Sequence, residues 1–346
     1  MVSISGDYTE TQETHDGVEF TRIRANSGRT LILIEDGDTF ENYLFDQQNS
    51  GAYVQIVTQM GWDHTPPASY TLRNIGWLGE MPNSSAGAMV LSCTNEATAE
   101  NIYLGDGHPA YPVSGSWNNY PTGILASLKH SGHLHYRGVT LANWSDNAMY
   151  CSPPAHPGDG NGTFTVENAH SIHSQISCFR FGTNTTLRNC YGRTKSGDHR
   201  VLWAYENSNT NSSQITVENS VFDAHNAHRA IEHHSTASVS LDGQSYYTGH
   251  NGGGSVSGGQ QTSSPPERTR ADVGAPESAL AAAIGAVADP TVEEPEPNPP
   301  DSVGTLDVAT RAPRDIDATS ARLRGQLVDL DDETADVYFE WRKVDE

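Results

Sequence analysis

The sequence predicts an all-β chain whose short strands wind into a parallel solenoid, followed by a linker and a small second β module. Glycine (32 residues) and proline (18 residues) are frequent, and charged residues make up only 18% of the chain, a composition that excludes coiled coils and most helical bundles. Short apolar runs alternate with turn residues over positions 1–250, and one three-residue motif recurs there.

The recurring motif is a β-forming residue, then a charged residue, then asparagine. It ends at Asn74, Asn101, Asn168, Asn189 and Asn219, and glycine replaces the asparagine at Gly138 and Gly243. The copies lie roughly 20 to 40 residues apart, which fits one coil of a solenoid. Asparagine and glycine tolerate left-handed backbone angles, so each copy predicts a short strand that ends in a tight turn.

A second strand is predicted in each coil, in four segments that begin at Asn147, Ser177, Arg200 and Arg229. When these segments are aligned, one column contains Met149, Phe179, Leu202 and Ile231, which we expect to stack in the core. The next column contains Tyr150, Arg180, Trp203 and Glu232. Because successive side chains of a strand point to opposite faces, this second column is predicted to face solvent.

The repeated turn asparagines, together with the segments Tyr70–Trp77 and Ile102–Gly107, resemble the right-handed parallel β-helix of pectate-lyase-like proteins, including those of haloarchaea and their viruses. The resemblance covers about residues 15–250. It implies that the turn asparagines stack into a ladder. It does not imply one activity, because this fold carries lyases, hydrolases, tailspikes, adhesins and purely structural proteins.

The sequence predicts three regions: a β-helix over 1–250 with an N-terminal cap, a linker over 251–302, and a β module over 303–346. The linker begins Gly/Ser-rich and ends Pro/Glu-rich, as flexible and extended spacers do, and contains one predicted short helix within 276–288. The last region resembles the first strands of a fibronectin type III-like module, which normally needs about 90 to 100 residues. It is either completed by strands of sister subunits or of another protein, or truncated.

The net charge is −23, and only three residues are lysines, Lys129, Lys195 and Lys343. An acidic, lysine-poor surface is typical of proteins from salt-in halophiles, where molar salt screens self-repulsion. The charge argues against a nucleic-acid partner, and no apolar run approaches the ~18 residues of a membrane span. The first residues form no signal peptide, so we expect the protein to be made in the host cytoplasm and to reach a virion surface.

The outward column is the candidate binding site. Aromatic faces stack on sugar rings, and arginine and glutamate anchor hydroxyls or carboxylates. The predicted glycan-binding residues are Tyr150, Arg180, Trp203, Tyr205, Glu232 and His234. The alternative is a solvated strand face with incidental aromatics.

Two other groups of residues suggest catalysis or metal binding, but their patterns are less specific. Arg180, Arg200 or Arg229 with Asp198, Asp223 or Glu232 resemble the basic and acidic groups of pectate-type lyases; if the chain is an enzyme, Arg180, Glu232 and Asp223 are the expected catalytic residues. Four histidines within 223–234 match no metal motif, and the four cysteines are expected to be small buried residues. No cofactor or metal is predicted.

These observations predict a structural protein of a haloarchaeal virus or provirus, such as a spike, fibre or capsid or tail decoration. It would form a homotrimer, contact host-surface glycan, and meet other virion proteins through its C-terminal module. One alternative is a polysaccharide lyase or glycoside hydrolase of the same fold. Another is a virion component without a glycan site.

Overall fold

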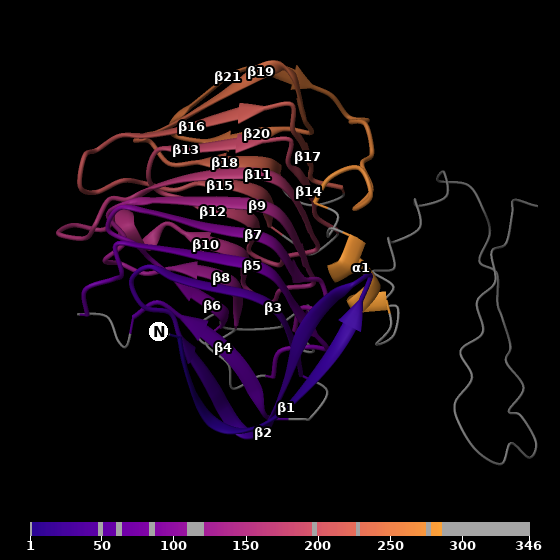
Figure 1. Cartoon of the computed structure of the whole chain (residues 1–346). Helices are drawn as coiled ribbons and strands as arrows, with labels where there is room; N and C mark the ends of the chain where they lie inside the picture. The colour runs from indigo at the N-terminus through magenta and orange to yellow at the C-terminus, as the bar shows by residue number, and fades with distance from the viewer. Residues whose placement is uncertain are drawn as a thin grey trace, which may run out of the picture. The chain divides into compact units, whose positions relative to one another are not determined.

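The computed structural model describes residues 2–47, 51–59, 64–82, 87–108, 121–195, 199–225, 229–274 and 278–285. Within these ranges the regular structure is almost entirely β-strand, and the strands stack in parallel coils as in a solenoid (Figure 1). The predicted C-terminal module (303–346) lies outside the described residues. No helix in the described part of the chain is long and apolar enough to span a membrane.

Each coil contributes strands to three stacks. The first stack is one short strand per coil, which we call sheet 1: β4 (Tyr53–Val57), β6 (Gly87–Leu91), β8 (Thr122–Ala126), β10 (Asn147–Cys151), β12 (Ser177–Phe181), β15 (Arg200–Ala204), β18 (Arg229–His233) and β20 (His250–Gly252). Successive members pair in parallel. A single-turn 3-10 helix, Pro153–Ala155, follows β10.

The other two stacks, sheets 2 and 3, come from the rest of each coil. In the lower coils one long strand supplies both: β3 (Asp38–Asp46), β5 (Ser69–Leu78), β7 (Glu96–Leu104), β9 (His133–Ala142) and β11 (Thr163–Ile172). Above them the strand is divided into β13 (Thr185–Arg188) with β14 (Tyr191–Arg193), then β16 (Ser213–Glu218) with β17 (Val221–Asp223). The last coil contains β19 (Ala237–Tyr247) and β21 (Ser255–Gln261).

The turn asparagines separate sheet 2 from sheet 3 and form the expected ladder. Asn74, Asn101, Asn168, Asn189 and Asn219 all have positive φ, as does Gly138 in the same column. The amide of Asn74 donates to Asn42 Oδ1 (2.8 Å), and that of Asn189 donates to Asn168 Oδ1 (3.1 Å). Gly243 departs from the pattern: its φ is not positive, and the strand is instead irregular between Leu241 and Tyr246.

Asn101 contributes to stability in two ways that substitutions can separate: its side chain donates to Asn74 of the ladder, and it tolerates a left-handed backbone. The residue is 5% exposed and has φ 55°. Asn101→Ala loses the side-chain bond to Asn74 and must hold an alanine in the left-handed region, so we expect a cost of about 2–3 kcal/mol in unfolding free energy. Asn101→Gly relieves the backbone strain and should cost about half as much, as Gly138 in the same column indicates. Denaturant unfolding of both variants checks this; equal losses would contradict it.

The interior is a continuous apolar core. Met149, Phe179, Leu202 and Ile231 are fully buried and occupy equivalent positions in successive coils, so the predicted stack is confirmed. The four cysteines are buried and free, as expected.

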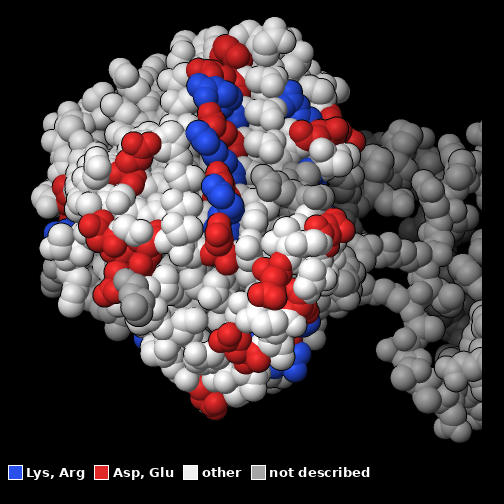
Figure 2. Space-filling model, in the orientation of Figure 1, with Lys and Arg blue, Asp and Glu red and all other residues white. Residues whose placement is uncertain are grey.

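The outer surface of sheet 2 carries a ladder of alternating charge, visible as a blue and red stripe in Figure 2. In order of coil its members are Glu41, Arg73, Glu100, Arg137, Glu167, Arg188 and Glu218, and each faces the next across adjacent strands. Arg137 Nε lies 3.2 Å from a Glu167 oxygen, and Arg188 Nε lies 2.7 Å from a Glu218 oxygen. We refer to these residues as the charge ladder.

The N-terminal end is closed by β1 (Ser3–His15), which runs antiparallel to β2 (Val18–Leu33) (Figure 1). β2 continues in parallel to β3 and β4. Ile4 and Tyr8 of β1 pack against the core.

The predicted linker begins differently from expectation. Residues 250–261 are strands β20 and β21, which pair with β18 and β19, so the Gly/Ser-rich start of the linker belongs to the solenoid. The physical reason is close approach: a Cβ at Gly258 would lie 2.0 Å from the Leu241 carbonyl oxygen. Glycine here permits tight packing and does not signal a flexible coil.

Residues 262–274 and helix α1 (Ser278–Gly285), together called the strap, lie along sheet 3. Arg268 donates to Asn189 Oδ1 (2.9 Å), and Val273 is buried in a cluster with Ile172 and Tyr191. Leu280 and Ile284 of α1 pack with Phe20, Leu44, Leu78 and Tyr103. A helix was predicted in this interval, but the packing of the strap against the solenoid was not.

Candidate functional site

The predicted outward column is present in the predicted register. Tyr150 faces Arg180, Arg180 faces Trp203, and Trp203 faces Glu232 on successive strands β10, β12, β15 and β18 of sheet 1. Tyr205 also belongs to this group, since its ring centroid lies 5.1 Å from that of Trp203 and 4.5 Å from that of His234. The six residues singled out from the sequence therefore lie together, and we call them the arginine–aromatic cluster.

Arg180 is the centre of this cluster. Its guanidinium carbon lies 4.3, 4.2 and 4.1 Å from the ring centroids of Tyr150, Trp203 and Tyr205. The residue is only 9% exposed, and its Nε has no hydrogen-bond partner among the described residues. Cation–π attraction holds the charge in this position, although burial lowers the pKa of Arg180. Because an arginine stays charged in proteins, a buried donor that lacks an acceptor is left at the site.

Two further arginines converge on the same surface. Arg200 Nε donates to Glu232 (2.7 Å), and the Arg200 guanidinium carbon lies 4.0 Å from the Trp203 ring. Arg229 Nε lies 3.7 Å from the same Glu232 oxygen. Arg200 and Arg229 thus share the Glu232 carboxylate, and a further acidic residue, Glu206, lies 3.8 Å from His234 of the cluster.

A further acidic group, Asp146, lies beside Arg180. Desolvation raises the pKa of Asp146 to about 6, although the charge of Arg180 opposes that shift. The Asp146 carboxyl accepts a hydrogen bond from the Asn147 amide (2.6 Å). The sequence analysis missed Asp146, because a single Asp in a turn before β10 carries no pattern.

The structure changes how the aromatic residues are interpreted. The rings of Tyr150 and Trp203 are only partly exposed, and the Trp203 ring contacts guanidinium groups of both Arg180 and Arg200. The cluster is therefore not a bare aromatic platform on which sugar rings stack. Its rings hold guanidinium groups in place, and those groups are the part of the site best suited to a ligand.

Asp223 is separated from this cluster, contrary to the grouping expected for a catalytic site. It lies on β17 in sheet 3, 7% exposed, with its carboxylate 3.6 Å from Arg193 Nε. Glu267 of the strap contacts the same Arg193 at 3.2 Å. Glu232 lies on β18 of sheet 1, so the two carboxylates belong to different sheets. Asp198 and His228 lie outside the described residues.

The described side chains of the histidine-rich stretch 223–234 also do not meet at one place. His233 Nδ1 accepts from the Gly254 backbone (3.0 Å), which leaves its Nε2 to donate to His250 Nδ1 (3.3 Å). His234 points instead to Tyr205 and lies 3.8 Å from Glu206. In the part of the chain that the structure describes, no three His, Cys, Asp or Glu side chains are placed to hold a metal ion.

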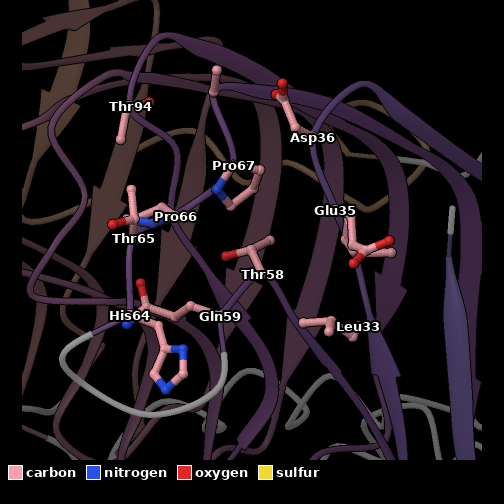
Figure 3. A pocket seen from close by; sticks show the side chains of 12 residues that line it. Leu33, Glu35, Asp36, Thr58, Gln59, His64, Thr65, Pro66, Pro67 and Thr94 are labelled. Carbon is pink, nitrogen blue, oxygen red and sulfur yellow. The ribbon is translucent and has the colours of Figure 1, made fainter.

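A separate open hollow of about 510 Å³ lies where β2, β4 and β6 end (Figure 3). Its polar lining includes Glu35, Asp36, Thr58, Gln59 and His64. Figure 3 shows Glu35 and His64 on opposite sides of the hollow, so they do not form an acid–base pair. No sequence pattern indicated this hollow, because its residues come from three separate turns.

The arginine–aromatic cluster is thus the best-defined site, with a buried and charged donor at its centre. It has the groups to bind an anion. Comparison of the chain with models of known protein families, with curated proteins and with solved structures finds no match.

Proposed function

We propose that the protein binds an acidic glycan through the arginine–aromatic cluster and performs no chemistry on it. The observation that carries this proposal is Arg180, a buried charge that three aromatic rings hold in place and whose Nε has no partner among the described residues. A guanidinium binds a carboxylate or a sulfate through paired, charge-assisted hydrogen bonds. Such groups are carried by uronic and sulfated sugars.

The spacing of the cluster also fits an extended chain of sugars. Its residues come from four neighbouring strands of sheet 1, and strands lie about 4.8 Å apart, so the cluster extends about 15 Å along the solenoid. This length accommodates about three sugar residues. Glu232 and His234 at the upper end would accept or donate hydrogen bonds to hydroxyl groups.

The biological setting is part of the same proposal. A stiff solenoid with an acidic, lysine-poor surface suits a spike or decoration on a virus of salt-in haloarchaea, where host-surface glycan is the receptor. A lyase or hydrolase of the same fold is the alternative. It is less well supported, because Asp223 lies apart from the cluster and Glu232 is paired with Arg200 and Arg229.

Arg180→Gln tests the proposal. Loss of a charged hydrogen bond costs about 1.5–3 kcal/mol, so we expect affinity for an oligouronate or a sulfated oligosaccharide to fall at least about tenfold, measured by calorimetry in molar KCl. Burial limits the screening of this contact by salt.

The matched control is Arg188→Gln, which removes an arginine from the exposed charge ladder and should leave affinity unchanged. Wild-type protein that binds no glycan, or equal losses in the two variants, would contradict glycan binding at this site. Release of unsaturated or reducing ends from the same oligosaccharides would favour the enzyme alternative.

A further inference from the structure

The outer column of sheet 1 changes character at β10. Tyr150 on β10 faces Arg180 of the arginine–aromatic cluster on one side and Leu125 of β8 on the other. From Leu125 the same column continues through Val90 of β6 to Val57 of β4, each opposite the next on parallel strands that Figure 1 shows stacked in order. We refer to Val57, Val90 and Leu125 as the apolar column.

The side chains of Val90 and Leu125 point away from the core. Met89, next to Val90, and Ile124, next to Leu125, are fully buried inside the solenoid. Val90 and Leu125 themselves are partly exposed. Because successive side chains of a strand point to opposite faces, these two lie on the outer surface of sheet 1. Val57, at the lower end of the column, is 6% exposed.

The outward positions of the other two sheets are different. Those of sheet 2 include the charge ladder. In sheet 3, apolar residues such as Ile172 and Tyr191 are buried in one cluster with Val273 of the strap. The apolar column is neither charged nor fully covered. Adjacent apolar side chains that stay accessible on a protein surface mark a place where another molecule binds.

We propose that the apolar column binds the same glycan as the arginine–aromatic cluster, at sugars that carry methyl or acetyl groups; this inference rests on the proposed function. A glycan whose acidic group meets Arg180 and which runs down the solenoid passes Tyr150, then Leu125, then Val90, in steps of about 4.8 Å. Apolar side chains cannot replace the hydrogen bonds that a sugar hydroxyl makes with water. Deoxy and acetylated sugars present methyl groups there instead.

A lipid with an anionic headgroup also has one charged part and one apolar part, but the column suits it less. A lipid tail is apolar on all sides and is best accommodated in a cavity that surrounds it. The apolar column is a single row of side chains on the surface of a sheet. A sugar can cover such a row with one face and keep its hydroxyl edges in water.

Calorimetry of the full-length protein in molar KCl tests this with two forms of one oligouronate hexamer. One form is O-acetylated, and the other is the same material after mild-base deacetylation, so that length and number of carboxylates match. We expect the acetylated form to bind about fourfold more tightly for each acetyl methyl group that the column buries. In the double variant Val90→Thr, Leu125→Thr, this preference should fall to about one, with affinity for the deacetylated form unchanged. Threonine is a strand-forming residue, so the fold is kept.

The matched control is Val256→Thr, at a partly exposed valine on β21 in the last coil, which should keep the preference. Arg180→Gln should weaken binding of both forms by the same factor. If it does so, but the wild type shows no preference or the double variant retains one, the apolar column does not contact the glycan and the proposed function stands. If Arg180→Gln leaves binding unchanged, or if neither form binds, both proposals are wrong. Decanoate that displaces the acetylated hexamer from the wild type would assign the column to a lipid and overturn the inference.

Discussion

The free energy of unfolding should fall steeply as the pH drops below about 6.5, because four histidines are buried without charge. Desolvation lowers the pKa of His108, His130 and His170 to about 4 and that of His173 to about 3. All four are at most 4% exposed. In the unfolded chain these residues titrate near 6.5. Between about pH 6.5 and 4 the unfolded state therefore binds protons that the folded state does not.

His130 shows why the folded state resists protonation. Its Nδ1 accepts from the Cys93 backbone (3.2 Å), and its Nε2 donates to the Thr163 carbonyl (3.2 Å). Both nitrogens are thus used in the neutral ring. A second ring proton would place a charge in the core, and burial opposes this although the Cys93 and Thr163 carbonyl oxygens lie within hydrogen-bond distance of the ring nitrogens.

The slope follows from proton counting. Each extra proton bound by the unfolded state lowers the free energy of unfolding by about 1.4 kcal/mol for each pH unit that the pH falls. Four such protons would give a slope of about 5.5 kcal/mol per pH unit. Asp146 acts in the opposite direction: its raised pKa of about 6 means that the folded state takes up a proton first as the pH falls. Burial also raises the pKa of Asp106 and Asp223, which opposes the histidines in the same way, and lowers the pKa of His133 and His233, which adds to them. The net slope is therefore the sum of opposing contributions, and the histidine contribution is fully present above about pH 6.5 and is lost as the pH falls toward about 4.

Denaturant unfolding at several pH values and constant salt measures this slope. His130→Gln should reduce it by about one proton. Thr186→Ala, which removes no titratable group, should leave it unchanged. A stability that is constant between pH 7 and 5 would contradict the prediction.

Phe164→Ala should cause a large loss of stability. Phe164 is 1% exposed, and its ring centroid lies 4.8 Å from that of His130 and 5.4 Å from that of Phe181. Its removal leaves a cavity in the middle of the stack, with a cost of about 3–5 kcal/mol. Because each coil contacts only its neighbours, the loss should also make the unfolding transition broader or biphasic.

The control for this variant is Thr186→Ala, on the outer side of the adjacent strand β13, with an expected change within about 0.5 kcal/mol. Calorimetry and denaturant unfolding of both variants check the size of the loss. Calorimetry also reports whether the two halves of the solenoid melt separately. Equal stability of the two variants would show that this part of the core tolerates the cavity.

The sequence was informative where its pattern repeats. Four segments that each alternate apolar and polar residues can be aligned in one way, so the register that brings Tyr150, Arg180, Trp203 and Glu232 together was predictable. The turn asparagines were predictable for the same reason. The charge ladder could also have been found, because the residue before each turn asparagine or Gly138 changes sign from one copy to the next between Arg73 and Glu218.

The sequence was uninformative where single residues make distant contacts. The strap is held by isolated apolar residues such as Val273 and Leu280 in a polar context, and their partners come from coils far away in the chain. Composition made the glycines of 252–259 look like a flexible linker, although close packing requires several of them. The burial of Arg180 depends on three rings from the two neighbouring coils, Tyr150 on one side and Trp203 and Tyr205 on the other, which no local pattern records.

The charge ladder restricts how such a chain can change length. Adjacent coils carry opposite signs from Glu41 to Glu218, so removing one internal coil, or duplicating one, would bring two like charges together on neighbouring strands. Removing or adding two consecutive coils keeps the alternation. Solenoids with this ladder should therefore differ from one another by even numbers of coils, and changes by an odd number should carry a compensating reversal of charge.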